Sequence, residues 1–95
     1  AKLANVDLSD ANLNKTDFNS AVLVNTNFSR ANVGLADFSQ ATLQNVNFNR
    51  ANMRAASLSN VKEITNCNWN GVYINSQTQL NQMIKNKIFD AYQGV

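Results

Sequence analysis

The stretch ANVDLSDANLNKTDFNSAVL, residues 4–23, repeats with a period of five residues. A large apolar residue returns at Leu8, Leu13, Phe18 and Leu23, and a small residue precedes each of them by two positions. Neither regular element has this period, because helical faces recur about every 3.6 residues and strand faces every second residue. A chain that turns once in every five residues brings each large residue back to the same side. The repeat therefore predicts a coil of short extended segments around an apolar lumen.

The period continues through twelve repeats. The large apolar positions, which we call centres, are Leu3, Leu8, Leu13, Phe18, Leu23, Phe28, Val33, Phe38, Leu43, Phe48, Met53 and Leu58. A four-sided coil stacks residues twenty apart, which places Phe18 on Phe38 and Phe28 on Phe48. A three-sided coil would stack Phe18 on Val33 and mix sizes in each column. Because close packing favours like on like here, the sequence predicts a four-sided all-β solenoid with phenylalanines on two opposite walls.

The units ANLNK, ANVGL, ADFSQ and ANMRA, starting at residues 11, 31, 36 and 51, are close to the pattern Ala-(Asp/Asn)-Leu-(Ser/Thr/Asn)-any. The chain thereby resembles the pentapeptide-repeat family over residues 1–60. The resemblance implies a right-handed quadrilateral β-helix with four repeats per coil, in agreement with the side count from stacking. We expect about four coils over residues 1–76, in a single domain with residues 77–95.

The period slips by one residue after Leu58. The next centres are Ile64, Trp69 and Ile74, so one extra residue lies within 59–63. Cys67 takes a small, inward position, where it is expected to pack as a core residue rather than act as a nucleophile.

The period changes again near the C-terminus. Leu80, Met83, Ile84 and Ile88 recur at helical spacing. We expect a short α-helix that begins between Ser76 and Gln79 and covers the open end of the lumen, since solenoids need capped ends. An amphipathic helix that binds a partner is the alternative.

Composition excludes several function classes. The chain has no histidine and one cysteine, so His-dependent catalysis, an internal disulfide and a cysteine zinc site are excluded. No apolar run approaches the roughly 18 residues of a membrane span. We therefore predict no enzyme, no cofactor, no metal and no membrane insertion. Cysteine usage favours the cytosol, and export after removal of an upstream segment stays open.

Three arginines form the candidate interaction site. Arg30 and Arg50 lie twenty residues apart and stack on one edge of the predicted coil, Arg54 follows nearby, and Asp10 lies below Arg30. Such an edge could hold phosphate or a carboxylate-rich partner; the alternative is a solvated surface.

Function is less determined than fold. The leading hypothesis is a non-enzymatic structural or protein-interaction module with an unidentified protein partner. The alternative is a DNA mimic, because some pentapeptide-repeat proteins engage DNA gyrase in this way. A net charge of +2 disfavours mimicry, which needs a dense negative surface, and it also argues against nucleic-acid binding.

The first coil offers a second candidate surface. Its centres Leu3, Leu8, Leu13 and Phe18 lie at an open end with unpaired backbone groups. Bare strand edges recruit other edges. We expect this end to be covered, by a second copy in a homodimer, by another pentapeptide-repeat protein, or by an upstream segment.

Overall fold

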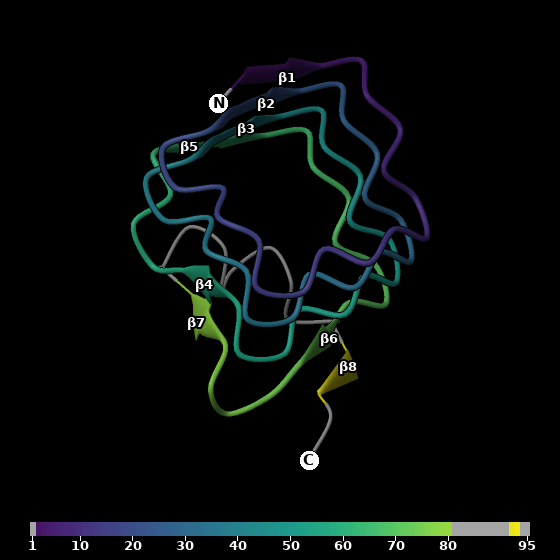
Figure 1. Cartoon of the computed structure of the whole chain (residues 1–95), viewed down its shortest axis with the longest axis vertical. Coiled ribbons are helices and arrows are strands. Elements are labelled where there is room, and N and C mark those ends of the chain that lie inside the picture. Colours follow the sequence, from purple (N-terminus) through teal and green to yellow (C-terminus); the bar gives the residue numbers. More distant parts are fainter. Residues whose placement is uncertain (1, 81–91, 94–95) are drawn as a thin grey trace.

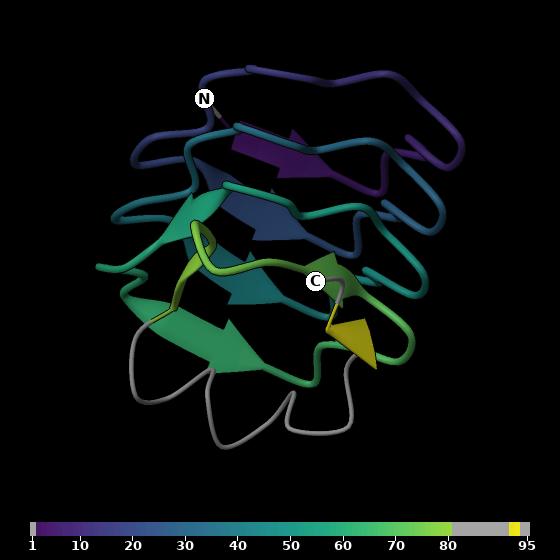
Figure 2. The same ribbon diagram turned by 90° about the horizontal axis from the view of Figure 1, so that it is seen from below.

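The computed structural model describes residues 2–80 and 92–93. Its chain winds in stacked, roughly square coils, seen along the coil axis in Figure 1 and from the side in Figure 2. The strands are short because each wall is only a few residues long: β1 (Lys2–Ala4), β2 (Val22–Val24), β3 (Thr42–Gln44), β4 (Ser57–Leu58), β5 (Glu63–Thr65), β6 (Tyr73–Ile74), β7 (Gln79–Leu80) and β8 (Tyr92–Gln93).

All strand pairing among the described residues is parallel. One sheet has the order β1-β2-β3-β5, and two smaller sheets pair β4 with β7 and β6 with β8. Leu3 lies opposite Leu23, which lies opposite Leu43, so the predicted register of twenty residues is confirmed. Ile64 then lies opposite Leu43, a step of twenty-one. The predicted extra residue therefore lies before β5, after the buried Val61.

Four walls enclose the lumen. The first wall carries β1, β2, β3 and β5. The centres of the second are Leu8, Phe28, Phe48 and Trp69; those of the third are Leu13, Val33, Met53 and Ile74; those of the fourth are Phe18, Phe38, Leu58 and Leu80. Most of these centres are fully or nearly fully buried, and Leu8, Leu13 and Leu80 are half-buried.

The phenylalanines stack as the sequence predicts. Phe18 and Phe38 are parallel, with centroids 4.9 Å apart, and Phe28 lies parallel to Phe48 at 5.2 Å. Rings from opposite walls meet edge to face, as Phe28 and Phe38 do at 5.9 Å and 87°. Edge-to-face and offset contacts are favourable geometries for aromatic rings, so the two aromatic columns fill the lumen together.

Most corners of the coil form without glycine or proline. Every fifth residue from Asn5 to Ala55 has a positive φ, and these include Arg30, Leu35 and Arg50. On the second, third and fourth walls the residue before most centres is Asn or Asp, and its Oδ1 accepts the backbone N–H two residues on, which stabilises the turn. Asn52 accepts from Arg54 and Asn32 from Gly34 in this way, at 3.1 and 3.0 Å.

The C-terminal prediction is partly wrong. No helix begins between Ser76 and Gln79: residues 76 and 77 form a turn, and Gln79–Leu80 is strand β7, paired with β4. Leu80 is a further centre, opposite Leu58, because the coil continues through a second one-residue extension. The rest of the predicted helix, 81–91, lies outside the described residues.

Candidate functional site

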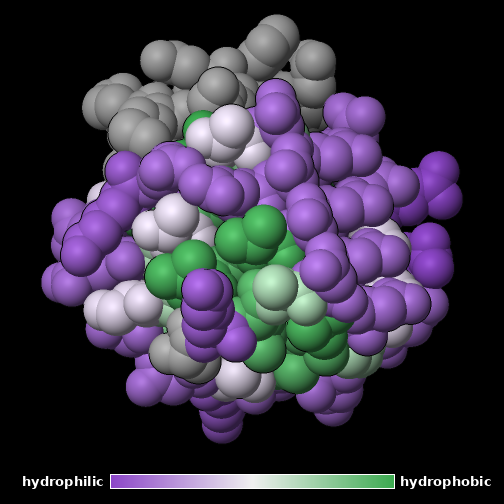
Figure 3. Space-filling model, turned by 90° about the horizontal axis from the view of Figure 1, so that it is seen from above, coloured by the Kyte–Doolittle hydropathy of each residue, from purple (hydrophilic) through white to green (hydrophobic). Residues whose placement is uncertain are grey.

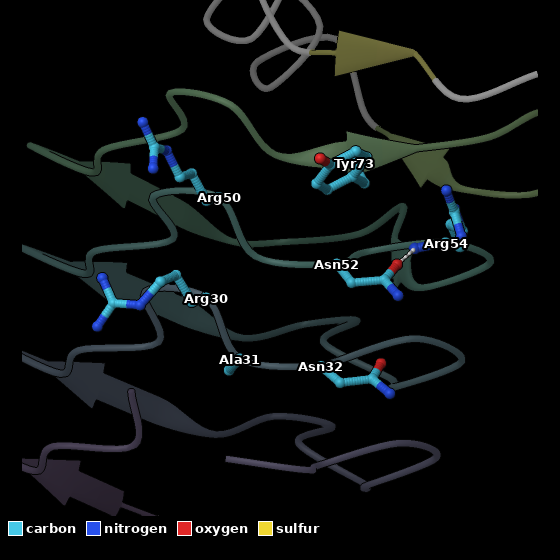
Figure 4. A pocket seen from close by; sticks show the side chains of 7 residues that line it. All are labelled: Arg30, Ala31, Asn32, Arg50, Asn52, Arg54 and Tyr73. Atoms are coloured by element: carbon cyan, nitrogen blue, oxygen red, sulfur yellow. Dashed lines mark hydrogen bonds between the residues drawn. The ribbon is translucent and has the colours of Figure 1, made fainter. Parts of the chain in front are cut away.

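A pocket of about 310 Å³ lies on the outside of the third wall, which we define as residues 10–15, 30–35, 50–55 and 71–75. It is open to solvent. Its lining, shown in Figure 4, contains all three arginines of the predicted site and comprises Arg30, Ala31, Asn32, Arg50, Asn52, Arg54 and Tyr73.

Backbone geometry sets where the arginines stand. Arg30 and Arg50 occupy successive corners, at φ values of 58° and 60°, so both side chains leave from the same edge of the wall. Arg54 follows the centre Met53 and lies toward the other edge (Figure 4). Between these edges the bridges Asn32–Asn52 and Asn52–Tyr73 align three outward side chains in one column.

Arg30 is neutralised by a carboxylate. Its Nε and Nη2 donate to Oδ1 and Oδ2 of Asp10 at 2.9 and 3.0 Å, the two-bond geometry that matches guanidinium to carboxylate. This contact lowers the pKa of Asp10 and raises that of Arg30. Both side chains are more than half exposed, so the pair adds little stability. The ion pair therefore compensates the positive charge of Arg30.

Arg50 forms no ion pair with a carboxylate of residues 2–80, where the ion pair is that of Asp10 with Arg30. Its stem lies against Gly71 instead. A Cβ on Gly71 would come within 3.1 Å of Arg50 Cγ, and Gly71 has a φ of +69°. A glycine at this corner therefore leaves room for the arginine stem and tolerates the left-handed backbone.

Arg54 lies over an aromatic ring. Its guanidinium carbon is 5.6 Å from the ring centroid of Tyr73, within the range of a cation–π contact. Tyr73 is 39% exposed, so its ring is part of the pocket surface. A guanidinium held by its face keeps its in-plane N–H donors for another partner.

The two asparagines present donors. Because Asn32 Oδ1 and Asn52 Oδ1 accept backbone N–H groups, the amide nitrogens are the ends directed away from those turns. The pocket is thus lined by guanidinium and amide N–H groups. The hydroxyl of Tyr73 can both donate and accept a hydrogen bond. Such a lining favours a ligand rich in acceptor oxygens.

Charge is distributed unevenly among the walls. In the described part of the chain, the third wall carries Lys15, Arg30, Arg50 and Arg54 against the single acid Asp10. The other described acids lie elsewhere: Asp7 on the second wall, Asp17 and Asp37 on the fourth, and Glu63 on the first. The third wall is therefore the basic side of a nearly neutral protein.

Sequence reasoning found the three arginines of the pocket and missed the rest of its lining, Tyr73 above all, with Ala31, Asn32 and Asn52. The signal was present, because a shift of twenty-one residues puts Tyr73 directly above Asn52, at a position where earlier coils carry Asn. Cys67 lies as predicted: it packs against the core, and its Sγ donates to the carbonyl of Leu43 at 3.7 Å.

The first-coil centres are more exposed than those further along. Leu3, Leu8 and Leu13 are half-buried against the core, whereas Phe18 is 6% exposed. The outside of the first wall adds an apolar area, visible in Figure 3, where Val22 and Val24 of β2 face outward beside β1. Covering of the first coil stays a prediction.

The repeat, the register and the coil identify the class of protein. The family model of pentapeptide repeats matches in eight copies over residues 1–40 and 34–62, and the chain belongs to this family, whose fold is a right-handed β-helix. No protein among those with curated descriptions matches the sequence.

One of the solved structures that match supports the fold. A pentapeptide repeat protein from the thylakoid lumen of Arabidopsis thaliana is similar over 99% of this chain and 78% of its own, at 22% identity and a TM-score of 0.64. A pentapeptide repeat protein of the cyanobacterium Cyanothece aligns with 84% of this chain and 64% of its own, at 25% identity and a TM-score of 0.41. HetL, a heterocyst-differentiation protein of Nostoc, aligns with 84% and 37%, at 24% identity and 0.40.

The described residues form no helix that is long and apolar enough to cross a membrane. Nor do they contain a cluster of three or more Cys, Asp or Glu side chains that could hold a metal ion.

Proposed function

We propose that this chain is a non-enzymatic protein-interaction module that binds its partner through the third wall. The observation that carries the proposal is the pocket, which collects three arginines and an exposed tyrosine on the most basic wall of the described coil. Arginine and tyrosine are, with tryptophan, the residue types most enriched where binding energy concentrates in interfaces. A repetitive rigid scaffold presents such side chains at fixed spacing, which favours recognition.

The pocket chemistry argues against catalysis. Its polar side chains are arginine, asparagine and tyrosine, so its lining contains neither a carboxylate nor an imidazole, the usual general bases. A general base needs a pKa near the working pH, and the sequence contains no histidine. The proposal therefore assigns binding rather than turnover to this site.

Charge distribution argues against DNA mimicry. A mimic needs a continuous acidic surface in place of phosphates. The four unpaired acids of the described residues, Asp7, Asp17, Asp37 and Glu63, are spread over three walls. The largest charged feature of these residues is positive, and it suits an acidic partner. The proposal holds for either compartment, cytosolic or exported, since the single cysteine is half-buried.

The test is affinity capture from an extract of the source cells with quantitative mass spectrometry. The bait is the full chain, compared with the double variant Arg50→Gln/Arg54→Gln. Glutamine is tolerated at such a corner, because Gln40 occupies an equivalent one at φ 62°. We expect a protein retained by the wild type to be lost with this variant.

The matched control is Lys2→Gln/Lys62→Gln. It removes the same two charges from exposed residues outside the third wall. Recovery of the partner should be unchanged with this control. Equal loss with both double variants would show that net charge, and not the third wall, retains the protein.

A further inference from the structure

The three arginines of the pocket are not equivalent. Arg30 is held by both oxygens of Asp10, whereas Arg50 and Arg54 have no carboxylate partner within residues 2–80. Their side chains are positioned by other means, Arg50 by its stem against Gly71 and Arg54 by the ring of Tyr73. As far as residues 2–80 show, two positive charges are thus presented without a counter-charge.

These two charges lie at opposite ends of the pocket. Arg50 stands on the corner beside Arg30, and Arg54 stands beside Tyr73 across the asparagine column (Figure 4). They are four residues apart on an extended wall, which separates their Cα atoms by up to roughly 13 Å. One tetrahedral anion needs donors that converge on a point, so this arrangement suits two separate anionic groups.

The surface between the two charges suits a peptide. Ala31 is small, and Asn32 and Asn52 direct their amide nitrogens away from the turns that use their oxygens. An extended peptide directs every second side chain to one face. Two acidic residues four positions apart would then match the spacing of Arg50 and Arg54, with one small side chain between them over the asparagines.

We infer that the pocket is a recognition site for an extended acidic segment of a partner protein, with one carboxylate bound by Arg50 and a second by Arg54. The inference rests on the proposed function and specifies the chemistry of the partner. Each guanidinium offers a pair of parallel N–H donors to a carboxylate, and the amides of Asn32 and Asn52 donate to the peptide carbonyls between them.

The probe is a short fluorescent peptide in which three serines separate two glutamates, with both ends blocked. Its affinity for the full chain is measured by fluorescence anisotropy at low ionic strength. We expect saturable binding that weakens about tenfold in Arg50→Gln/Arg54→Gln and stays unchanged in Lys2→Gln/Lys62→Gln. Circular dichroism of each variant verifies that it is folded.

Three further measurements, each with a different ligand, define the chemistry that the pocket recognises. A peptide with two glutamines in place of the glutamates should not bind, and one with adjacent glutamates should bind more weakly. Inorganic phosphate at equal concentration should not displace the probe, and displacement would assign the pocket to phosphate.

Two results would overturn the inference. The first is equal weakening in the two double variants, and the second is no binding of the probe at about 1 mM. If arginine-dependent capture of a protein from cells persisted in either case, the module proposal would stand with a different ligand chemistry.

Discussion

The indole of Trp69 lies parallel to the ring of Phe48, with centroids 4.7 Å apart and 11° between the planes. Trp69 thus extends the aromatic column of the second wall by one coil. Its Nε1 is buried without a hydrogen-bond partner among the described residues. An unpaired buried donor costs about 1–3 kcal/mol, so the stacking of Trp69 is partly offset by its own N–H.

Trp69→Phe should change the free energy of unfolding by less than about 1 kcal/mol, because the lost indole area is compensated by removal of the unpaired N–H. Phe48→Ala, by comparison, should cost about 3–5 kcal/mol through a cavity in the column. Urea denaturation followed by circular dichroism measures both. A loss for Trp69→Phe as large as that for Phe48→Ala would show that the indole N–H has a partner.

Leu35→Gly should raise the free energy of unfolding by about 1 kcal/mol. Leu35 has a φ of 60° and is 52% exposed, so the mutation relieves left-handed backbone strain and removes little buried area. Ala31→Gly is the control, at a buried residue outside the positive-φ corners, and it should destabilise. A loss at both positions would mean that the corner backbone is not strained.

Acid should weaken the fold partly through Asp37. Hydrogen bonds from the side chain and backbone N–H of Ser39 lower the pKa of this carboxyl below its ordinary 3.8. A lowered pKa stabilises the folded state above the ordinary value, and this contribution is lost as pH falls through the folded pKa. Asp37→Asn should therefore flatten the decline in stability between about pH 5 and 2. An unchanged decline would exclude Asp37 as a cause.

Asp10→Asn should strengthen binding of the acidic peptide, because it releases Arg30 from its ion pair and adds a third available charge to the pocket. We expect a gain of about threefold at low salt and a smaller gain at high salt, where surface charges are screened. Anisotropy titrations at two ionic strengths measure it. Unchanged affinity at low salt would indicate that Arg30 lies too far from the ligand to contribute.

The first coil should support pairing of two copies. Leu3, Leu8 and Leu13 are half-buried at this end. Among the described strands β1 pairs only with β2, so its other edge is open. An edge of this kind recruits another edge. Light scattering on the 95-residue chain should give a dimer that Leu8→Glu converts to a monomer. A monomer for the unmodified chain at high concentration would refute the pairing.

The fold was predictable because the five-residue period carries it. Centres such as Leu23 and Phe38 are specified by pattern alone, and columns such as Phe18–Phe38 follow from comparing residue sizes at each possible register. The ion pair of Asp10 with Arg30 follows from the same register of twenty. These are consequences of spacing, which the sequence states directly.

The end of the coil was less predictable, because Leu80 satisfies two periods. Its spacing to Met83 and Ile84 is helical, yet in the structure it lies opposite Leu58 in β7. The second one-residue extension before β7 hides this pairing from a strict count. Tyr73 was missed for a related reason, since its place in the pocket depends on the first extension, and the contact of Arg54 with its ring depends on rotamers.

The most direct test of the central claim, that the third wall is the binding surface, is a two-dimensional ¹H–¹⁵N NMR titration with the two-glutamate peptide. We predict that the largest shifts fall on the side-chain amides of Asn32 and Asn52 and on the backbone amides of Gly34 and Arg54. Shifts confined to the apolar first wall, around Val22 and Val24, would contradict the account.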